Sequence, residues 1–185
     1  GGDMAVGGYG ISNSVATIFG MFIIGLDQGM QPIAGYNYGA QNIDRLMRVL
    51  NLAIIAATCI MTIGWIIGEF FPQQIARLFT TDEKLTAMSI TATRFNMLAF
   101  PIIGFQMVVT NFFQCIGKVK ISIFLSLSRQ LLILVPLLAI LPYFFQINGV
   151  WYALPLSDAT ASIIAFTIMT VFIKRFKKRI TTSTP

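Results

Sequence analysis

Three ionisable side chains lie inside long apolar runs of this sequence, at Asp27, Arg129 and Asp158. A charge at the centre of a bilayer costs about 2.5–3.5 kcal/mol on the mildest scale, so it normally faces a partner or a water-filled cavity. Counting about 1.5 Å per helical residue places the three side chains at overlapping depths. We therefore expect Arg129 to pair with Asp158 or with Asp27, because an unpaired buried charge is the least favourable arrangement.

Such an ion pair can have either of two roles. It is a static contact that fixes helix packing, or one of the acids is coupled to the movement of a cation or a proton. We assign Arg129 and Asp158 as structural charges and keep Asp27 as a candidate for the working site.

Neutral polar residues accompany these charges. Asn13, Gly20 and Asp27 recur at seven-residue spacing, and Gln31 follows Asp27 by four residues, so all four lie near one face of a helix. A later apolar segment adds further amides. The residues that we expect to line a polar cavity are Asp27, Gln31, Asn96, Gln106 and Asn111. Hydrogen bonding between helices is the alternative role for the amides.

The elements that must position these residues are membrane helices. The 185 residues are 56% hydrophobic and only 11% charged, with a mean hydropathy of +0.76, whereas an ordinary soluble domain has about 25% charged residues. The net charge of +6 would suit nucleic acid, but no soluble basic domain carries it. We therefore expect a membrane protein that does not bind nucleic acid.

Several classes of chemistry are disfavoured by missing residues. The sequence has no His, so Ser-His-Asp and Cys-His arrangements cannot form, and its two cysteines, Cys59 and Cys115, lie in apolar segments without CxxC spacing. It also has no glycine loop with a lysine that would bind nucleotide phosphates. We expect neither enzymatic activity nor a metal site or a cofactor, and ATP-driven transport is disfavoured.

Hydropathy predicts an all-α membrane protein with five transmembrane helices. The expected helices cover about residues 4–40, 46–70, 83–116, 121–145 and 150–173. Together they form one transmembrane lobe over residues 1–175, and a polar cytoplasmic tail follows over 176–185.

Local signals refine these helices. Pro101 and Pro136 predict kinks, because proline removes a backbone hydrogen bond and crowds the preceding turn. Residues 72–81 are expected to form a link between helices. At its end, Thr80 and Glu83 fit a capping box that opens the third helix.

The basic residues predict the orientation in the membrane. With five spans, one side receives Arg45, Arg48, Lys118, Lys120 and the cluster over 174–179, while far fewer basic residues fall on the other side. The positive-inside rule makes the first side cytoplasmic. The chain is then expected to begin outside and to end in the cytoplasm.

The stretch after Asp27 resembles a family signature. Residues 28–40 read QGMQPIAGYNYGA, which is similar to the end of the eighth helix of multidrug and toxic-compound extrusion (MATE) transporters. The residues that carry the signature are Gln28, Gly29, Pro32, Gly35, Tyr36, Asn37 and Gly39. Further similarity follows in the same order at 78–80, 101–104, 112–118, 127–130 and 149–158, so the resemblance covers nearly the whole chain.

The resemblance implies a fold and a set of partners. Family members have twelve helices in two six-helix lobes, and this chain resembles the second lobe without its first helix. The implied partners are the N-terminal lobe of the same transporter, membrane lipids and small organic substrates. The implied location is the inner (plasma) membrane of a bacterium, with several passes and a cytoplasmic C-terminus.

The implied function is secondary active antiport, in which protons or sodium drive the export of organic, often cationic, drugs or toxic compounds. In the sodium-coupled branch of the family, one acid that binds the ion lies in the helix matching residues 83–116. The corresponding stretch here, around 104–106, has no carboxylate. This departure weakens a sodium site of that type, and the choice between H+ and Na+ stays open.

Two other functions remain as alternatives. A related flippase for lipid-linked saccharides would need basic residues in its cavity for a phosphate headgroup, and Arg129 is the only deep cation. A non-transporting membrane scaffold would pack a sealed, dry interface around Asp27, whereas a hydrated cleft there would favour transport. An intramembrane enzyme is disfavoured by the lack of a nucleophile with a base.

Overall fold

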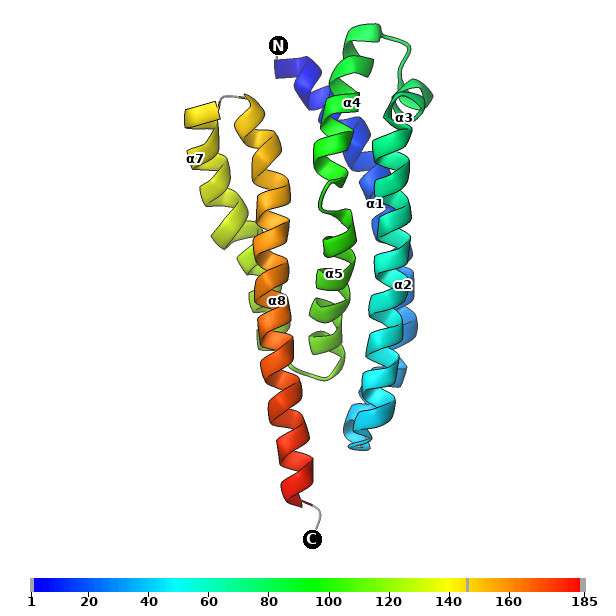
Figure 1. The fold of residues 1–185 in the computed structure, drawn as a ribbon, viewed down its shortest axis with the longest axis vertical. Coiled ribbons are helices and arrows are strands. Elements are labelled where there is room, and N and C mark those ends of the chain that lie inside the picture. Colours follow the sequence, from blue (N-terminus) through cyan, green and yellow to red (C-terminus); the bar gives the residue numbers. More distant parts are fainter. Residues whose placement is uncertain (1, 146, 184–185) are drawn as a thin grey trace.

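The computed structural model describes residues 2–145 and 147–183, which are almost entirely helical and contain no strand (Figure 1). The elements are α1 (Gly2–Gly39), α2 (Ile43–Phe70), α3 (Pro72–Phe79), α4 (Glu83–Met97), α5 (Phe100–Cys115), α6 (Val119–Leu127), the π-helix η1 (Ser128–Leu134), α7 (Val135–Phe145) and α8 (Ile147–Ser183).

By length and composition, the helices provide five candidate membrane spans when the bent pair α4 and α5 counts as one. Four are long and apolar enough to cross a bilayer as single segments, over Val6–Gly39, Ile43–Phe70, Val119–Tyr143 and Gly149–Phe176. The fifth is a broken span in which α4 and α5 are bent by 51°. The all-α fold and the five expected spans are therefore confirmed.

The centre of the bundle is α5, which packs against α1, α2, α6 and α8 (Figure 1). Phe112 and Phe113 of this helix are fully buried, and both meet Phe172 of α8 edge to face. At Gly104, a Cβ atom would lie 2.9 Å from the carbonyl oxygen of Ala57 in α2. Glycine at this position therefore lets the backbones of α5 and α2 approach closely.

The predicted irregularity at Pro101 is confirmed, but it is a break and not a kink in one continuous helix. Residues 98–99 separate α4 from α5, and Pro101 occupies the first turn of α5. Proline is well tolerated there because the first N–H groups of a helix have no intrahelical acceptor. Near Pro136, the irregular segment is the π-helix η1, which precedes the proline.

Two expectations about the region 72–83 were wrong. The expected link contains the short helix α3, with Pro72 in its first turn. The cap of α4 is Asp82, whose Oδ1 accepts from the backbone N–H of Lys84 at 2.8 Å, and Thr80 instead accepts from the N–H of Asp82. The carboxylate adjoining the first helical residue thus displaces the expected capping box.

The last helix also differs from its prediction, because α8 continues past the expected end at 173 to Ser183. Phe176 stacks on Phe172 one turn earlier, with ring centroids 5.7 Å apart, and on Tyr38 of α1 at 5.1 Å. These contacts hold the start of the expected tail on the bundle, and the helix continues to Ser183; residues 184–185 lie outside the described chain.

Candidate functional site

A polar cavity of about 580 Å³ is lined by residues of α1, α2, α4, α5, α6, η1 and α8. Its volume falls within the roughly 300–1,000 Å³ that is usual for sites binding small molecules. The neutral polar residues in its lining include Asn13, Thr17, Asn96, Gln106, Thr110, Asn111, Ser126 and Gln130. Two charged residues, Arg129 and Asp158, complete the polar lining. We refer to this space as the polar cavity.

Asp27 adjoins the polar cavity through Asn111. The Asp27 side chain is 3% exposed, and its Oδ2 accepts a hydrogen bond from the Asn111 amide. Its Oδ1 is buried and has no hydrogen-bond partner among the described residues. Since Asn111 lines the cavity and also holds the acid, it links the cavity to a buried carboxylate with one unsatisfied oxygen.

Gln106 and Asn96 lie at the same cavity in different environments. Gln106 is 3% exposed, and its Oε1 has no hydrogen-bond partner in the described part of the chain. Asn96 donates to Ser12 Oγ at 3.0 Å and so ties α4 to α1. Asn96 therefore combines a place in the cavity with the interhelical bonding that was its alternative role.

Of the predicted cavity residues, neither Asp27 nor Gln31 is in the lining; Asp27 adjoins it through Asn111, whereas Gln31 does not. Its side chain is exposed, and it is absent from the cavity lining. The face of α1 that packs into the bundle carries Asp27, Met30 and Ala34, all buried. Gln31 lies about 100° around the helix from Met30 and about 40° from Asp27, which places it at the edge of the packed face, where its side chain is exposed.

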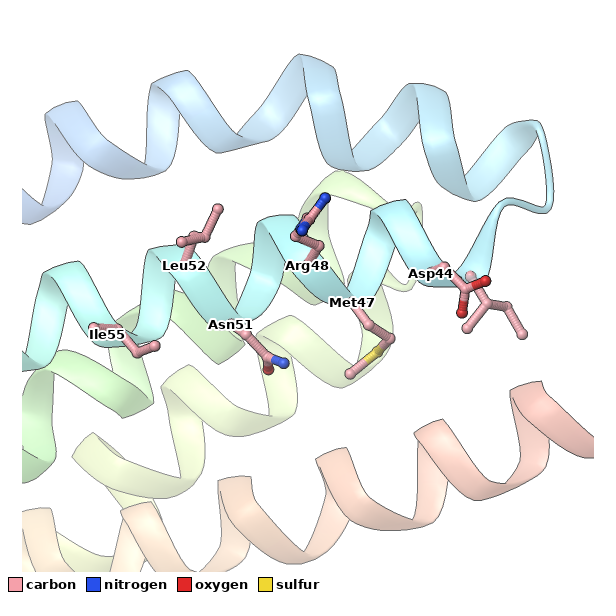
Figure 2. Close-up of a pocket in the computed structure, with 7 residues that line it drawn as sticks. Asp44, Met47, Arg48, Asn51, Leu52 and Ile55 are labelled. Atoms are coloured by element: carbon pink, nitrogen blue, oxygen red, sulfur yellow. The ribbon is translucent and has the colours of Figure 1, made fainter.

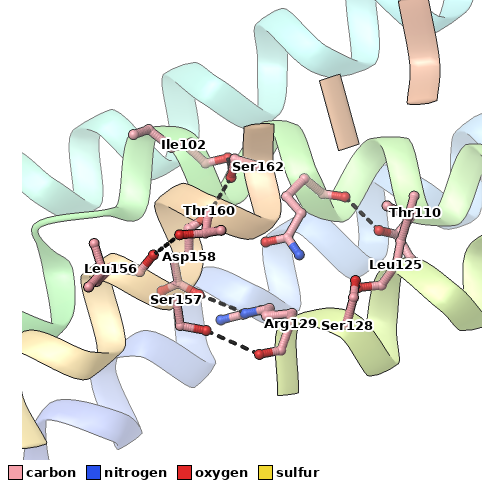
Figure 3. Close-up of polar contacts among 11 residues, drawn as sticks. Ile102, Thr110, Leu125, Ser128, Arg129, Leu156, Ser157, Asp158, Thr160 and Ser162 are labelled. Carbon is pink, nitrogen blue, oxygen red and sulfur yellow. Dashed lines mark hydrogen bonds and ion pairs between the residues drawn. The ribbon is translucent and has the colours of Figure 1, made fainter. Parts of the chain in front are cut away.

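Arg129 pairs with Asp158 and not with Asp27, which resolves the two expected pairings (Figure 3). Arg129 Nε donates to Asp158 Oδ1 at 2.7 Å, and Ser157 Oγ donates to the Arg129 carbonyl oxygen at 3.1 Å. Ser162 Oγ in turn donates to the Asp158 carbonyl oxygen at 2.8 Å. Two neighbouring residues of α8 thus hold both the side chain and the backbone of Arg129.

Sequence reasoning missed Ser157 and the π-helix around Arg129. Ser157 was detectable only as the neighbour of the buried Asp158. The π-helix has no sequence signal that we recognise, although π-helical turns occur frequently at functional sites. Several hydroxyls of the lining were also missed, because Ser and Thr are common in membrane helices and carry no distinctive spacing.

The signature residues form the end of α1 and its turn into α2. Asn37 is buried, and its side chain donates to the Ile33 carbonyl oxygen at 2.8 Å. Its own carbonyl oxygen accepts from the Asn42 N–H at 2.9 Å, and Gln41 adopts a positive φ of 56°. The other signature side chains Gln28, Pro32 and Tyr36 are exposed. The signature therefore shapes a helix end and an open surface, and it adds no side chain to the polar cavity.

A second hollow of about 380 Å³ runs along the start of α2, beside Asp44, Arg48 and Asn51 (Figure 2). All of its lining residues come from this one helix. Its polar groups therefore do not converge from several elements, as they do in the polar cavity. Among the described residues, no group of three or more His, Cys, Asp or Glu side chains could hold a metal ion.

Comparison with known proteins places the chain in a family. The family model described as MatE matches residues 2–140. The multidrug export protein MepA of Staphylococcus aureus (strain MSSA476) is 25% identical over 182 residues, covering 98% of this chain and 40% of that protein. MepA of Staphylococcus haemolyticus is 24% identical over 173 residues, covering 91% of this chain and 37% of the relative.

Solved structures agree with this placement. The MATE multidrug transporter DinF-BH, solved as a complex with a ligand, is 34% identical with a TM-score of 0.82, over 92% of this chain and 38% of that one. A MATE structure in complex with MaL6 has the same fold, with a TM-score of 0.89 at 24% identity, over 96% of this chain and 41% of that one. The chain thus spans about two fifths of the length of these relatives. It belongs to the MatE family, as the signature over residues 28–40 predicted.

Proposed function

We propose that this chain is the second lobe, without its first helix, of a two-lobed secondary transporter in a bacterial inner membrane. The transporter exports organic, often cationic, drugs or toxic compounds in exchange for protons or sodium. The export activity of the MepA relatives and the partial coverage of their length support this proposal. The two lobes would rock around a central site, while ion and substrate favour opposite states.

The observation that carries the proposal is the polar cavity within an otherwise apolar bundle. Amides, hydroxyls and an ion pair from several helices converge on one space of about 580 Å³. Polar groups inside a membrane protein usually mark a pathway for an ion or a substrate, because they are costly to keep there. A scaffold would instead bury its amides in dry contacts between helices.

Asp27 is the residue that we assign to ion coupling. Its carboxylate faces one neutral amide and keeps a buried oxygen unsatisfied, so binding of a proton or of Na+ would neutralise an expensive buried charge. Because Asn111 touches both Asp27 and the cavity, a change at the acid would alter the donor that Asn111 offers to substrate. Coupling would then follow because Asp27 and the substrate compete for the side-chain amide of Asn111.

The open face of α1 supports docking of another part of the transporter. A Cβ atom added at Gly25 or Gly29 would meet nothing within 4 Å. Small residues on an open helix face let a second backbone approach closely. We assign this face to contact with the remaining helices of the transporter, and the exposed apolar side chains elsewhere to contact with lipid.

The proposed orientation places the C-terminus in the cytoplasm. The α1–α2 turn, the α5–α6 turn and the end of α8 lie at the same end of the bundle (Figure 1). These segments carry Arg45, Lys118 and Lys174, as the positive-inside rule requires for a cytoplasmic side. In a cysteine-free transporter, an impermeant thiol reagent applied to intact cells should label Lys84→Cys and spare Lys118→Cys; the reverse pattern would invert the topology.

Drug accumulation in efflux-deficient bacteria tests the function. Cells that express the complete transporter containing this chain should accumulate less ethidium than cells without it. Asp27→Asn should abolish this difference, whereas Asp44→Asn, at an exposed acid of α2, should not. A protonophore and a sodium-free medium then separate the two coupling ions. Unchanged export by Asp27→Asn would remove this residue from coupling, and no export by the wild type would refute the function.

A further inference from the structure

The ion pair at the polar cavity leaves most of the Arg129 guanidinium unused. Arginine has five N–H donors in a rigid planar fork. Only Nε is committed, to Asp158 Oδ1 at 2.7 Å, and no other side-chain hydrogen bond of Arg129 is found among the described residues. The Arg129 side chain is 39% exposed, against 10% for Asp158. The two terminal amino groups therefore remain available on a residue that lines the cavity.

The surroundings of Arg129 hold this fork in place. Asp158 fixes the side chain at Nε, and Ser157 fixes the backbone by donating to the Arg129 carbonyl oxygen at 3.1 Å (Figure 3). Both residues belong to α8, which packs along η1. A group positioned by such supporting contacts loses little freedom when it binds a ligand.

The lining also favours an anionic group at this position. Among the described lining residues, Arg129 is the only cation, and its counter-ion Asp158 is engaged on the Nε edge. The rest of the polar lining is neutral amides and hydroxyls, which can accept or donate hydrogen bonds but cannot supply charge. The free edge of an arginine matches the two oxygens of a carboxylate in a bidentate contact.

We infer that the terminal amino groups of Arg129 form a subsite for the carboxylate of an organic substrate. This inference rests on the proposed function and deepens it: where a substrate carries a carboxylate, that group docks at Arg129. Asp158 acts as a positioning residue that turns the guanidinium edge towards the cavity. A static ion pair, by contrast, would contribute nothing to the choice of ligand.

A matched pair of dyes tests the subsite in the complete purified transporter. Rhodamine 6G is an ethyl ester with a cationic ring system, and its hydrolysed free acid is a zwitterion that differs only at the carboxyl group. Fluorescence polarisation would measure the Kd of each dye. The variant Arg129→Gln with Asp158→Asn removes both charges together and leaves no buried charge unpaired. Arg94→Gln removes an arginine that does not line this cavity and that pairs with Glu69 at 3.7 Å, and it serves as the control.

The double variant should weaken binding of the free acid by about tenfold or more, the size expected for a charge-assisted contact, and change the Kd of the ester less than threefold. The control should leave both values unchanged. If the double variant binds neither dye, the Kd values of both dyes are measured for Arg129→Lys. The ratio of the free-acid Kd to the ester Kd should then rise relative to the wild type, because lysine cannot make the bidentate contact. An unchanged ratio in these variants would overturn the subsite.

The wild type separates the subsite from the proposed function. If it exports the ester but does not bind the free acid, the subsite is overturned while the proposed function stands. If it exports neither dye, the function itself is refuted.

Discussion

Two acids are buried among the residues of the lobe whose burial is described, and their surroundings differ. Asp158 faces a guanidinium at 2.7 Å, and its helix also holds the arginine backbone through Ser157. Asp27 faces a neutral amide and keeps one buried oxygen without a partner among the described residues. The charge of Asp158 is neutralised by a residue of the protein, whereas the charge of Asp27 can be neutralised only by a proton or a cation that binds reversibly. Burial alone therefore does not identify a working acid; the charge of its partner does.

Removing the arginine should have the largest effect on folding. Arg129→Ala leaves the nearly buried Asp158 carboxylate without its cation, which should cost about 3 kcal/mol, the low end for a broken buried pair because Arg129 is partly exposed to the cavity. Thermal unfolding in detergent measures this loss. The swap of Arg129→Asp with Asp158→Arg should recover part of the stability that either single reversal loses. No recovery in the swap would show that the pair is not a unit.

Removing the amide at the other site should have an intermediate effect. Asn111→Ala leaves both oxygens of Asp27 without a hydrogen bond, which should cost about 1–3 kcal/mol. The loss should shrink when Asp27→Leu is added, because no buried charge then remains. A loss that is the same in both backgrounds would mean that the contact between Asp27 and Asn111 carries no energy.

The backbone contact at the ion pair should be weaker. Ser157→Ala removes the hydrogen bond to the Arg129 carbonyl oxygen, which should cost about 0.6 kcal/mol, the average for such bonds in membrane proteins. Thr160→Ala, which removes a bond only within α8, is the control. If the two variants unfold at the same temperature, Ser157 does not support the arginine.

Neutralising Asp27 should have the smallest effect on folding. Asp27→Asn removes a buried charge that has no cation partner and keeps a polar side chain beside Asn111, so stability should change by less than about 1 kcal/mol or increase. The same substitution should abolish export. A large loss of stability would place Asp27 with Asp158 as a structural acid, and the contrast between the two sites would disappear.

Much of this fold follows from the sequence, because the lengths of apolar runs determine where helices can cross a bilayer. The pairing of Arg129 was narrowed to two acids by depth alone. The choice between Asp27 and Asp158 depends on the packing of η1 against α8, which cannot be predicted from the depth of the residues in the membrane. Gln31 was misplaced for a related reason: its four-residue spacing puts it near Asp27 on the helix, but spacing alone does not show where the packed face ends. The break before α5 lies at residues 98–99, whereas Pro101, which predicted an irregularity here, lies in the first turn of the following helix.

The π-helix at Arg129 has a consequence for how this lobe can change in length. A π-type hydrogen bond closes over one residue more than an α-type bond, so η1 accommodates an additional residue without disturbing the packing on either side of it. A related chain that lacks one residue between Ser128 and Leu134 would keep α6 and α7 in their present register by replacing η1 with ordinary α-helix. The arginine would then face another direction. Single-residue deletions or insertions in this segment thus offer evolution a route to redirect one charged side chain while the membrane spans stay as they are.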